Sequence, residues 1–105
     1  MKDNTEYQIF IGCHDPQLQD EIVSEDELRE MVVQFFERKK MDFSMFSVKG
    51  GYLHEDGRFI SENSMCINII GSYDLDIIKL AKSLSMYMNQ ECSLIVKDYI
   101  HADFC

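Results

Sequence analysis

The order of strand-like and helix-like segments restricts the fold of this chain more than any other feature of its sequence. Residues 7–13 (YQIFIGC) form a nearly continuous apolar run, which is typical of a central strand. The segments that follow are an amphipathic helix at 24–40, strands at 43–54 and 58–70, a second amphipathic helix at 74–88 and a strand at 93–100. The expected order is therefore strand, helix, hairpin, helix, strand.

The first helix is marked by signals at both of its ends. Ser24 is a candidate N-cap and Glu27 completes a capping box, while Val23 and Leu28 have the spacing of a hydrophobic staple. Acidic residues follow the cap and basic residues occupy 38–40, as the helix dipole favours. One face is apolar and consists of Leu28, Met31, Val32, Phe35 and Phe36.

Turn chemistry marks the hairpin. Asp56-Gly57 predicts a tight two-residue turn in which both residues have positive φ. Glu55 and Arg58 would then face each other across the turn as a charge pair. Gly50-Gly51 suggests a bulge or bend in the first strand of the hairpin.

The second helix is expected to use Asp74 as its N-cap and to end at Asn89 in the left-handed conformation. Short connections favour right-handed crossings, which place both helices on one face of the sheet. The predicted fold is α+β, a ferredoxin-like βαββαβ sandwich with an antiparallel four-stranded sheet of order 4-1-3-2. Residues 1–105 are expected to form a single domain, and the other face of its sheet has no predicted cover.

Net charge restricts the partners. Nineteen acidic and ten basic residues give a formal net charge of −9 and a pI near 4.6. This charge opposes direct binding to nucleic acid and to anionic membranes, because both are negatively charged. It either keeps a small protein soluble or complements a basic protein surface. The polar N-terminus and the shortness of every apolar run predict a cytoplasmic protein without membrane contact.

Cys13, His14 and Asp15 form the tightest cluster of reactive residues. Neighbouring residues of an extended chain point to opposite faces, and the spacing does not match a zinc site. A buried cysteine followed by a loop histidine is therefore the simpler interpretation, and an activated Cys–His pair is the alternative. All four cysteines are expected to be reduced. The sequence predicts no catalytic residue, metal or cofactor.

Carboxylates concentrate between residues 15 and 30. Helix capping accounts for part of this charge, but no local structural role is evident for Asp15, Asp20 or Glu21. The segment is therefore the expected contact with a basic partner. The predicted partner-binding residues are Asp15, Asp20, Glu21, Glu25, Asp26 and Glu30.

Apolar residues are also expected on the uncovered face of the sheet. Large exposed apolar patches are unusual on monomers, so the sequence predicts a homodimer formed through this face. The candidate dimer-face residues are Phe43, Met45, Phe46, Cys66 and Ile70.

Two stretches carry a resemblance to known proteins: GGYLHEDGRFISENSMCINII at 50–70 and YMNQECSLIV at 87–96. They resemble a family of small uncharacterised bacterial proteins, a domain of unknown function with a Gly-aromatic, Glu-Asn-Ser and Gln-x-Ser/Val pattern. That resemblance implies no site residues. In size and charge alone, the chain is also similar to small acidic proteins of phages and mobile elements, including inhibitors of CRISPR effectors.

These observations favour a non-enzymatic acidic protein-binding module. One form of it is an inhibitor that engages a basic nucleic-acid-binding surface of a partner, as a nucleic-acid mimic would. The alternative is a dimeric ferredoxin-like enzyme or small-molecule binder, in which two uncovered sheets enclose a pocket.

Overall fold

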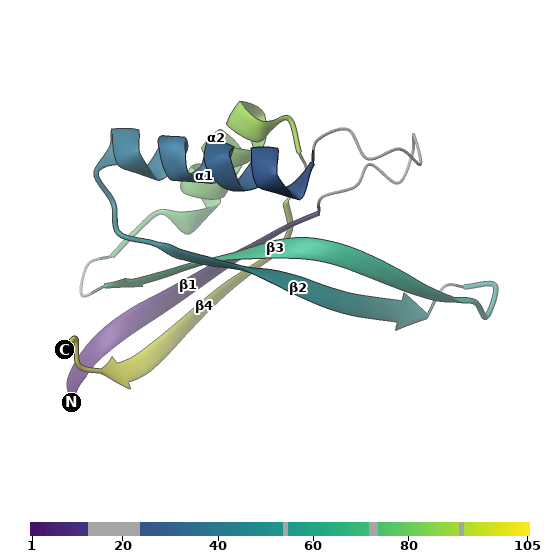
Figure 1. Cartoon of the computed structure of the whole chain (residues 1–105). Helices are drawn as coiled ribbons and strands as arrows, with labels where there is room; N and C mark the ends of the chain where they lie inside the picture. Colours follow the sequence, from purple (N-terminus) through teal and green to yellow (C-terminus); the bar gives the residue numbers. More distant parts are fainter. Residues whose placement is uncertain (13–23, 54, 72–73, 91) are drawn as a thin grey trace.

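A four-stranded antiparallel sheet carries two helices on one of its faces in the computed structural model, which describes residues 1–12, 24–53, 55–71, 74–90 and 92–105 (Figure 1). The elements are β1 (Lys2–Gly12), α1 (Glu25–Lys39), β2 (Ser44–Leu53), β3 (Phe59–Gly71), α2 (Ile77–Met88) and β4 (Cys92–Ala102). The sheet order is β2-β3-β1-β4. The predicted ferredoxin-like fold and its strand order are confirmed. Among the described residues, no helix is long and apolar enough to cross a membrane.

Helix α1 begins where its capping signal predicts. The Ser24 hydroxyl accepts a hydrogen bond from the Glu27 backbone N–H at 3.2 Å, and Lys40 ends the helix in the left-handed conformation with φ of 54°. Leu28, Val32 and Phe36 are fully buried under the helix. The staple residue Val23 lies outside the described residues.

The core lies between the helices and the two central strands. Tyr7, Ile9 and Ile11 alternate along β1 toward the helices, because successive side chains of a strand point to opposite faces. Each fully buried apolar side chain stabilises the fold by about 1.5–3 kcal/mol. The other buried members from the strands and helices are Leu28, Val32, Phe35, Phe36, Met65, Ile67, Ile69, Ile77, Leu80, Ala81, Leu84 and Met88.

The start of α2 differs from the prediction. Asp76, not Asp74, is the N-cap, and its carboxylate accepts from the Lys79 backbone N–H at 3.1 Å. Asp74 instead contacts the Tyr7 hydroxyl and the Lys97 ammonium, so the helix starts later in the chain. The predicted end is confirmed, since Asn89 is left-handed with φ of 52°.

The hairpin connection also differs. Leu53 and Phe59 form the last cross-strand pair, so five residues connect the strands. Gly57 has φ of 87°, whereas Asp56 does not have positive φ and a tight two-residue turn is therefore wrong. Asp56 pairs with Arg58 at 2.6 Å, in place of the predicted Glu55–Arg58 pair.

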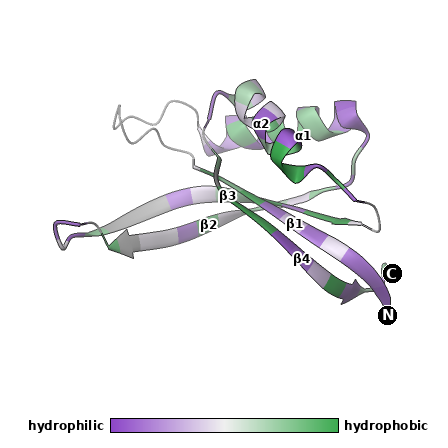
Figure 2. Ribbon diagram, turned by 180° about the vertical axis from the view of Figure 1, so that it is seen from behind, coloured by the Kyte–Doolittle hydropathy of each residue, from purple (hydrophilic) through white to green (hydrophobic). Residues whose placement is uncertain are grey.

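The pairing of β2 with β3 runs through Gly50-Gly51 without a shift, so the predicted bulge is wrong. An irregularity lies instead between Phe10 and Ile11, where β1 faces β4. Both of these strands are longer than predicted, and their pairing begins where Lys2 of β1 lies opposite Ala102 of β4. They run past the helices, and Figure 2 shows hydrophilic residues at the start of β1 near the N-terminus.

The role of Asp76 as the N-cap of α2 can be tested by substitution. We expect Asp76→Ala to lower the free energy of unfolding by about 1 kcal/mol, because a backbone N–H of the first turn loses its acceptor. Asp76→Asn should stay close to the wild-type value, since asparagine caps as well as aspartate. Urea unfolding measures both variants, and equal losses in the two would contradict a capping role.

Candidate functional site

A polar and aromatic cluster lies on the helix side of the sheet, where β1 and β4 run past the helices. We name it the Tyr7 cluster; its members are Tyr7, Asp74, Lys97 and Tyr99. Cross-strand pairing places Tyr7 opposite Lys97, and Tyr99 is two residues further along β4 on the same face. Asp74 comes from the segment that precedes α2.

The Tyr7 hydroxyl fixes this segment to the sheet. Tyr7 is 1% exposed, and its hydroxyl accepts a hydrogen bond from the Leu75 backbone N–H at 3.0 Å. The same hydroxyl lies 3.5 Å from Oδ1 of Asp74, to which it can donate its proton. The tyrosine therefore closes the core and also positions the carboxylate above it.

The Lys97 ammonium lies in the middle of the cluster. It is 3.4 Å from Oδ1 of Asp74 and is over both tyrosine rings, 5.8 Å from the centroid of Tyr7 and 5.6 Å from that of Tyr99. The hydrogen bond with Asp74 is the main cause that raises the pKa of Lys97 above its usual value. One carboxylate and two aromatic faces thus surround a single positive charge, which is an arrangement that binds cations.

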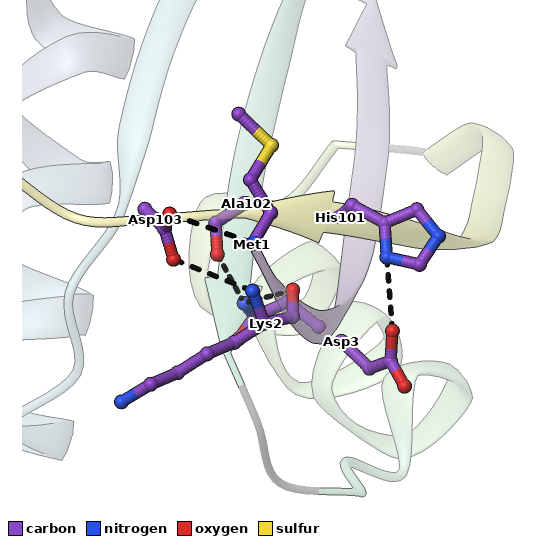
Figure 3. A network of polar contacts seen from close by, with 7 residues as sticks. Met1, Lys2, Asp3, His101, Ala102 and Asp103 are labelled. Carbon is purple, nitrogen blue, oxygen red and sulfur yellow. Dashed lines mark hydrogen bonds and ion pairs between the residues drawn. The ribbon is translucent and has the colours of Figure 1, made fainter.

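The ends of β1 and β4 are held together beside this cluster. Lys2 donates its backbone N–H to Asp103 at 3.3 Å, and Asn4 donates to the carbonyls of Lys2 and Ala102 at 3.3 and 3.0 Å (Figure 3). Nδ1 of His101 lies 2.9 Å from Oδ1 of Asp3 in the same view. A hollow of about 470 Å³ lies here, lined by Asp3, Asn4, Thr5, Tyr99, Ile100 and His101.

A second hollow, of about 480 Å³, lies between α2 and β4 and is mainly apolar. Its lining residues are Ile78, Ala81, Lys82, Ser85, Met86, Cys92, Leu94 and Ile95. Burial raises the pKa of the Cys92 thiol, so the thiol stays protonated at neutral pH and is a poor nucleophile. The Tyr7 cluster and its adjacent hollow hold more charged and hydrogen-bonding groups than this apolar hollow does, and they are therefore the better candidate site.

The sequence did not single out the Tyr7 cluster as a site. Its members are far apart in the chain, and only the register of β1 against β4 brings them together. Tyr7 was expected only as a strand residue and Asp74 only as an N-cap. Among the described residues, no group of three or more His, Cys, Asp or Glu side chains could hold a metal ion.

Half of the predicted partner-binding residues, Asp15, Asp20 and Glu21, lie outside the described residues, as do Cys13 and His14. Glu25, Asp26 and Glu30 are exposed on the first turns of α1. The Ser47 hydroxyl and then the Arg29 guanidinium bind the Glu25 carboxylate and lower its pKa. Part of this acidic surface is therefore already neutralised within the chain.

The predicted dimer-face residues lie on two different faces. Phe43 stacks on Phe36 with ring centroids 4.7 Å apart, and both Phe43 and Met45 pack against the core on the helix side. Cross-strand pairing places Phe46 beside Cys66 on the face that the helices leave uncovered, which we call the open face. Phe43 and Met45 therefore do not belong to the predicted dimer face. Ile70 is four residues after Cys66 on β3, so its side chain points to the same open face.

No protein-family model matches the chain, and no curated protein sequence matches it. Solved structures that resemble it include two of a phage SAM lyase. One is a phage SAM lyase in complex with S-methyl-5′-thioadenosine, with 21% identity, a TM-score of 0.55 and coverage of 92% of this chain and 80% of that chain. The other is a phage SAM lyase in the apo state, with 18% identity, a TM-score of 0.59 and coverage of 98% and 93%.

These comparisons contradict the main functional prediction. Both similar structures are of an enzyme, and neither is of an inhibitor or a nucleic-acid mimic. The expectation that the chain is a non-enzymatic acidic binding module is therefore wrong, and the comparisons agree better with the alternative of a ferredoxin-like enzyme or small-molecule binder. The resemblance to phage proteins is supported in part, because both similar structures are of a phage enzyme. At this level of identity they establish the fold.

Proposed function

We propose that this protein is an enzyme that binds and cleaves S-adenosylmethionine. The observation that carries the proposal is the correspondence of nearly the whole chain with a phage SAM lyase, one structure of which holds S-methyl-5′-thioadenosine. The match covers 98% of this chain and 93% of the apo structure, and 92% of this chain and 80% of the structure with S-methyl-5′-thioadenosine.

The chemistry of this substrate suits the Tyr7 cluster. S-adenosylmethionine presents a sulfonium cation, an adenine ring and an amino-acid group. Tyr99 is 77% exposed and offers an aromatic face, and Asp74 offers a carboxylate for positive charge. The adjacent hollow of about 470 Å³ has a volume in the range of small-molecule sites.

S-methyl-5′-thioadenosine forms when the bond between sulfur and the four-carbon amino-acid group breaks. The electron pair of that bond moves to sulfur, and the positive sulfonium becomes a neutral thioether. The four-carbon fragment is then completed either by loss of a proton or by attack of its own carboxylate. A site that holds the sulfonium charge therefore binds the substrate more strongly than this product.

The acidic net charge also has a place in this proposal. A formal charge of −9 raises the local concentration of a cationic ligand and repels anionic competitors. The effect weakens with salt, because the screening length is about 8 Å at physiological ionic strength. Charge that was first attributed to a basic protein partner thus fits a cationic small molecule.

The direct test is incubation of the purified protein with S-adenosylmethionine, with S-methyl-5′-thioadenosine measured by mass spectrometry. We expect product from the wild type, and from Tyr99→Ala a KM that rises about tenfold with little change in kcat. The matched control is Phe59→Ala, an aromatic of similar exposure at the hairpin end of β3, which should leave KM unchanged. No product from the wild type would overturn the proposed activity.

We further propose that copies of the chain associate through the open face. Phe46, Cys66 and Phe10 lie in one row across β2, β3 and β1. Val96 lies in the next row, opposite Gln8, and Ile70 lies one row further, opposite Glu6. Phe46 is 46% exposed, whereas Cys66 is fully buried between its neighbours. The row of Phe46, Cys66 and Phe10 is apolar, and burial against a second copy would remove it from water.

Association can be measured by sedimentation velocity at tens of micromolar protein. We expect Phe46→Lys to shift the protein toward the monomer, because a charge would be buried in the contact. Leu53→Lys is the matched control: Leu53 is on the same strand and is 71% exposed, but its parity places it away from the open face. A monomeric wild type, or equal effects of the two substitutions, would contradict association through this face.

A further inference from the structure

The Tyr7 cluster surrounds a cation that belongs to the chain itself. Three groups converge on the Lys97 ammonium: the Asp74 carboxylate at 3.4 Å and the faces of the Tyr7 and Tyr99 rings. We infer that Lys97 occupies, in the free protein, the place of an onium ligand, a sulfonium or quaternary ammonium, and that such a ligand displaces it.

The exposures of Asp74, Lys97 and Tyr7 permit this exchange. The side chain of Asp74 is 91% exposed and that of Lys97 is 38% exposed, so the ammonium can move into water without disturbing the core. The Tyr7 ring is buried and fixed by its bond from Leu75, so the floor of the site stays in place. Departure of the ammonium leaves the Asp74 carboxylate and the faces of the Tyr7 and Tyr99 rings without a cation.

Two positive charges cannot share this place. The cluster has one carboxylate, and like charges a few ångströms apart repel each other unless water separates them. The incoming cation must therefore replace Lys97. The charge of Asp74 stays compensated in both states, so the exchange exposes no unpaired carboxylate.

Hydration favours the ligand in this exchange. A lysine ammonium is a compact, strongly hydrated charge with three N–H donors, and it regains its water when it leaves the rings. A sulfonium or quaternary ammonium has no N–H donor and gains more from aromatic faces, which are the usual binding surface for such groups. The cluster thus selects onium ligands over primary amines.

The identity of the natural ligand as S-adenosylmethionine rests on the proposed function, but the exchange does not. The test accordingly uses trimethylsulfonium, which lacks the adenosine and amino-acid groups. Binding is followed by NMR through the ring resonances of the tyrosines, in wild type and in Lys97→Met, which keeps the apolar stem of the side chain. Lys97→Gln is a second variant without the charge, and Lys49→Met is the matched control on another strand.

We expect Lys97→Met and Lys97→Gln to bind trimethylsulfonium about fivefold more tightly than wild type, because the internal competitor is gone. Lys49→Met should match wild type, and Tyr99→Ala in the Lys97→Met background should lose the gain. Unchanged or weaker binding in both Lys97 variants would overturn the exchange.

The two proposals fail separately. Absence of S-methyl-5′-thioadenosine with tighter trimethylsulfonium binding in the Lys97 variants would remove the proposed activity and leave the exchange. Turnover by wild type with no gain in the Lys97 variants would remove the exchange and leave the activity.

Discussion

The alternation of β1 between the two faces of the sheet is the constraint on which the rest of the structure depends. As a central strand it pairs with both β3 and β4, so its register fixes theirs. Ile9 and Ile11 bury under the helices, and Tyr7, two residues earlier, is both the last core residue and the base of the candidate site. A shift by one residue would exchange these side chains with those of the open face.

Local signals predicted the elements that local chemistry determines. Ser24 and Glu27 give the start of α1, and Asn89 gives the end of α2, because capping depends on a few neighbouring residues. The start of α2 could not be read in this way. Asp74 was the expected cap, but its carboxylate lies 3.5 Å from the hydroxyl of Tyr7, 67 residues away in the chain, and Asp76 caps the helix.

The same reason explains why the Tyr7 cluster could not be predicted as a site from the sequence. Tyr7, Asp74 and Lys97 come from three segments, and no spacing along the chain relates them. Net charge, in contrast, is visible in the sequence but does not identify a partner. Its attribution to a basic protein surface stays a prediction: Arg29 and Ser47 engage the Glu25 carboxylate within the chain, and a cationic small molecule would benefit from the same field.

The two surfaces proposed for binding are on opposite faces of the same two strands. Tyr7 and Lys97 face the helix side, whereas Phe10 and Val96 face the open side. Association through the open face therefore leaves the Tyr7 cluster accessible from solvent. A site that stays open cannot exclude water by enclosure, and its Asp74 carboxylate is 91% exposed to solvent. The Lys97 ammonium lies 3.4 Å from this carboxylate and is itself 38% exposed, so the same openness that admits water also lets the internal cation leave.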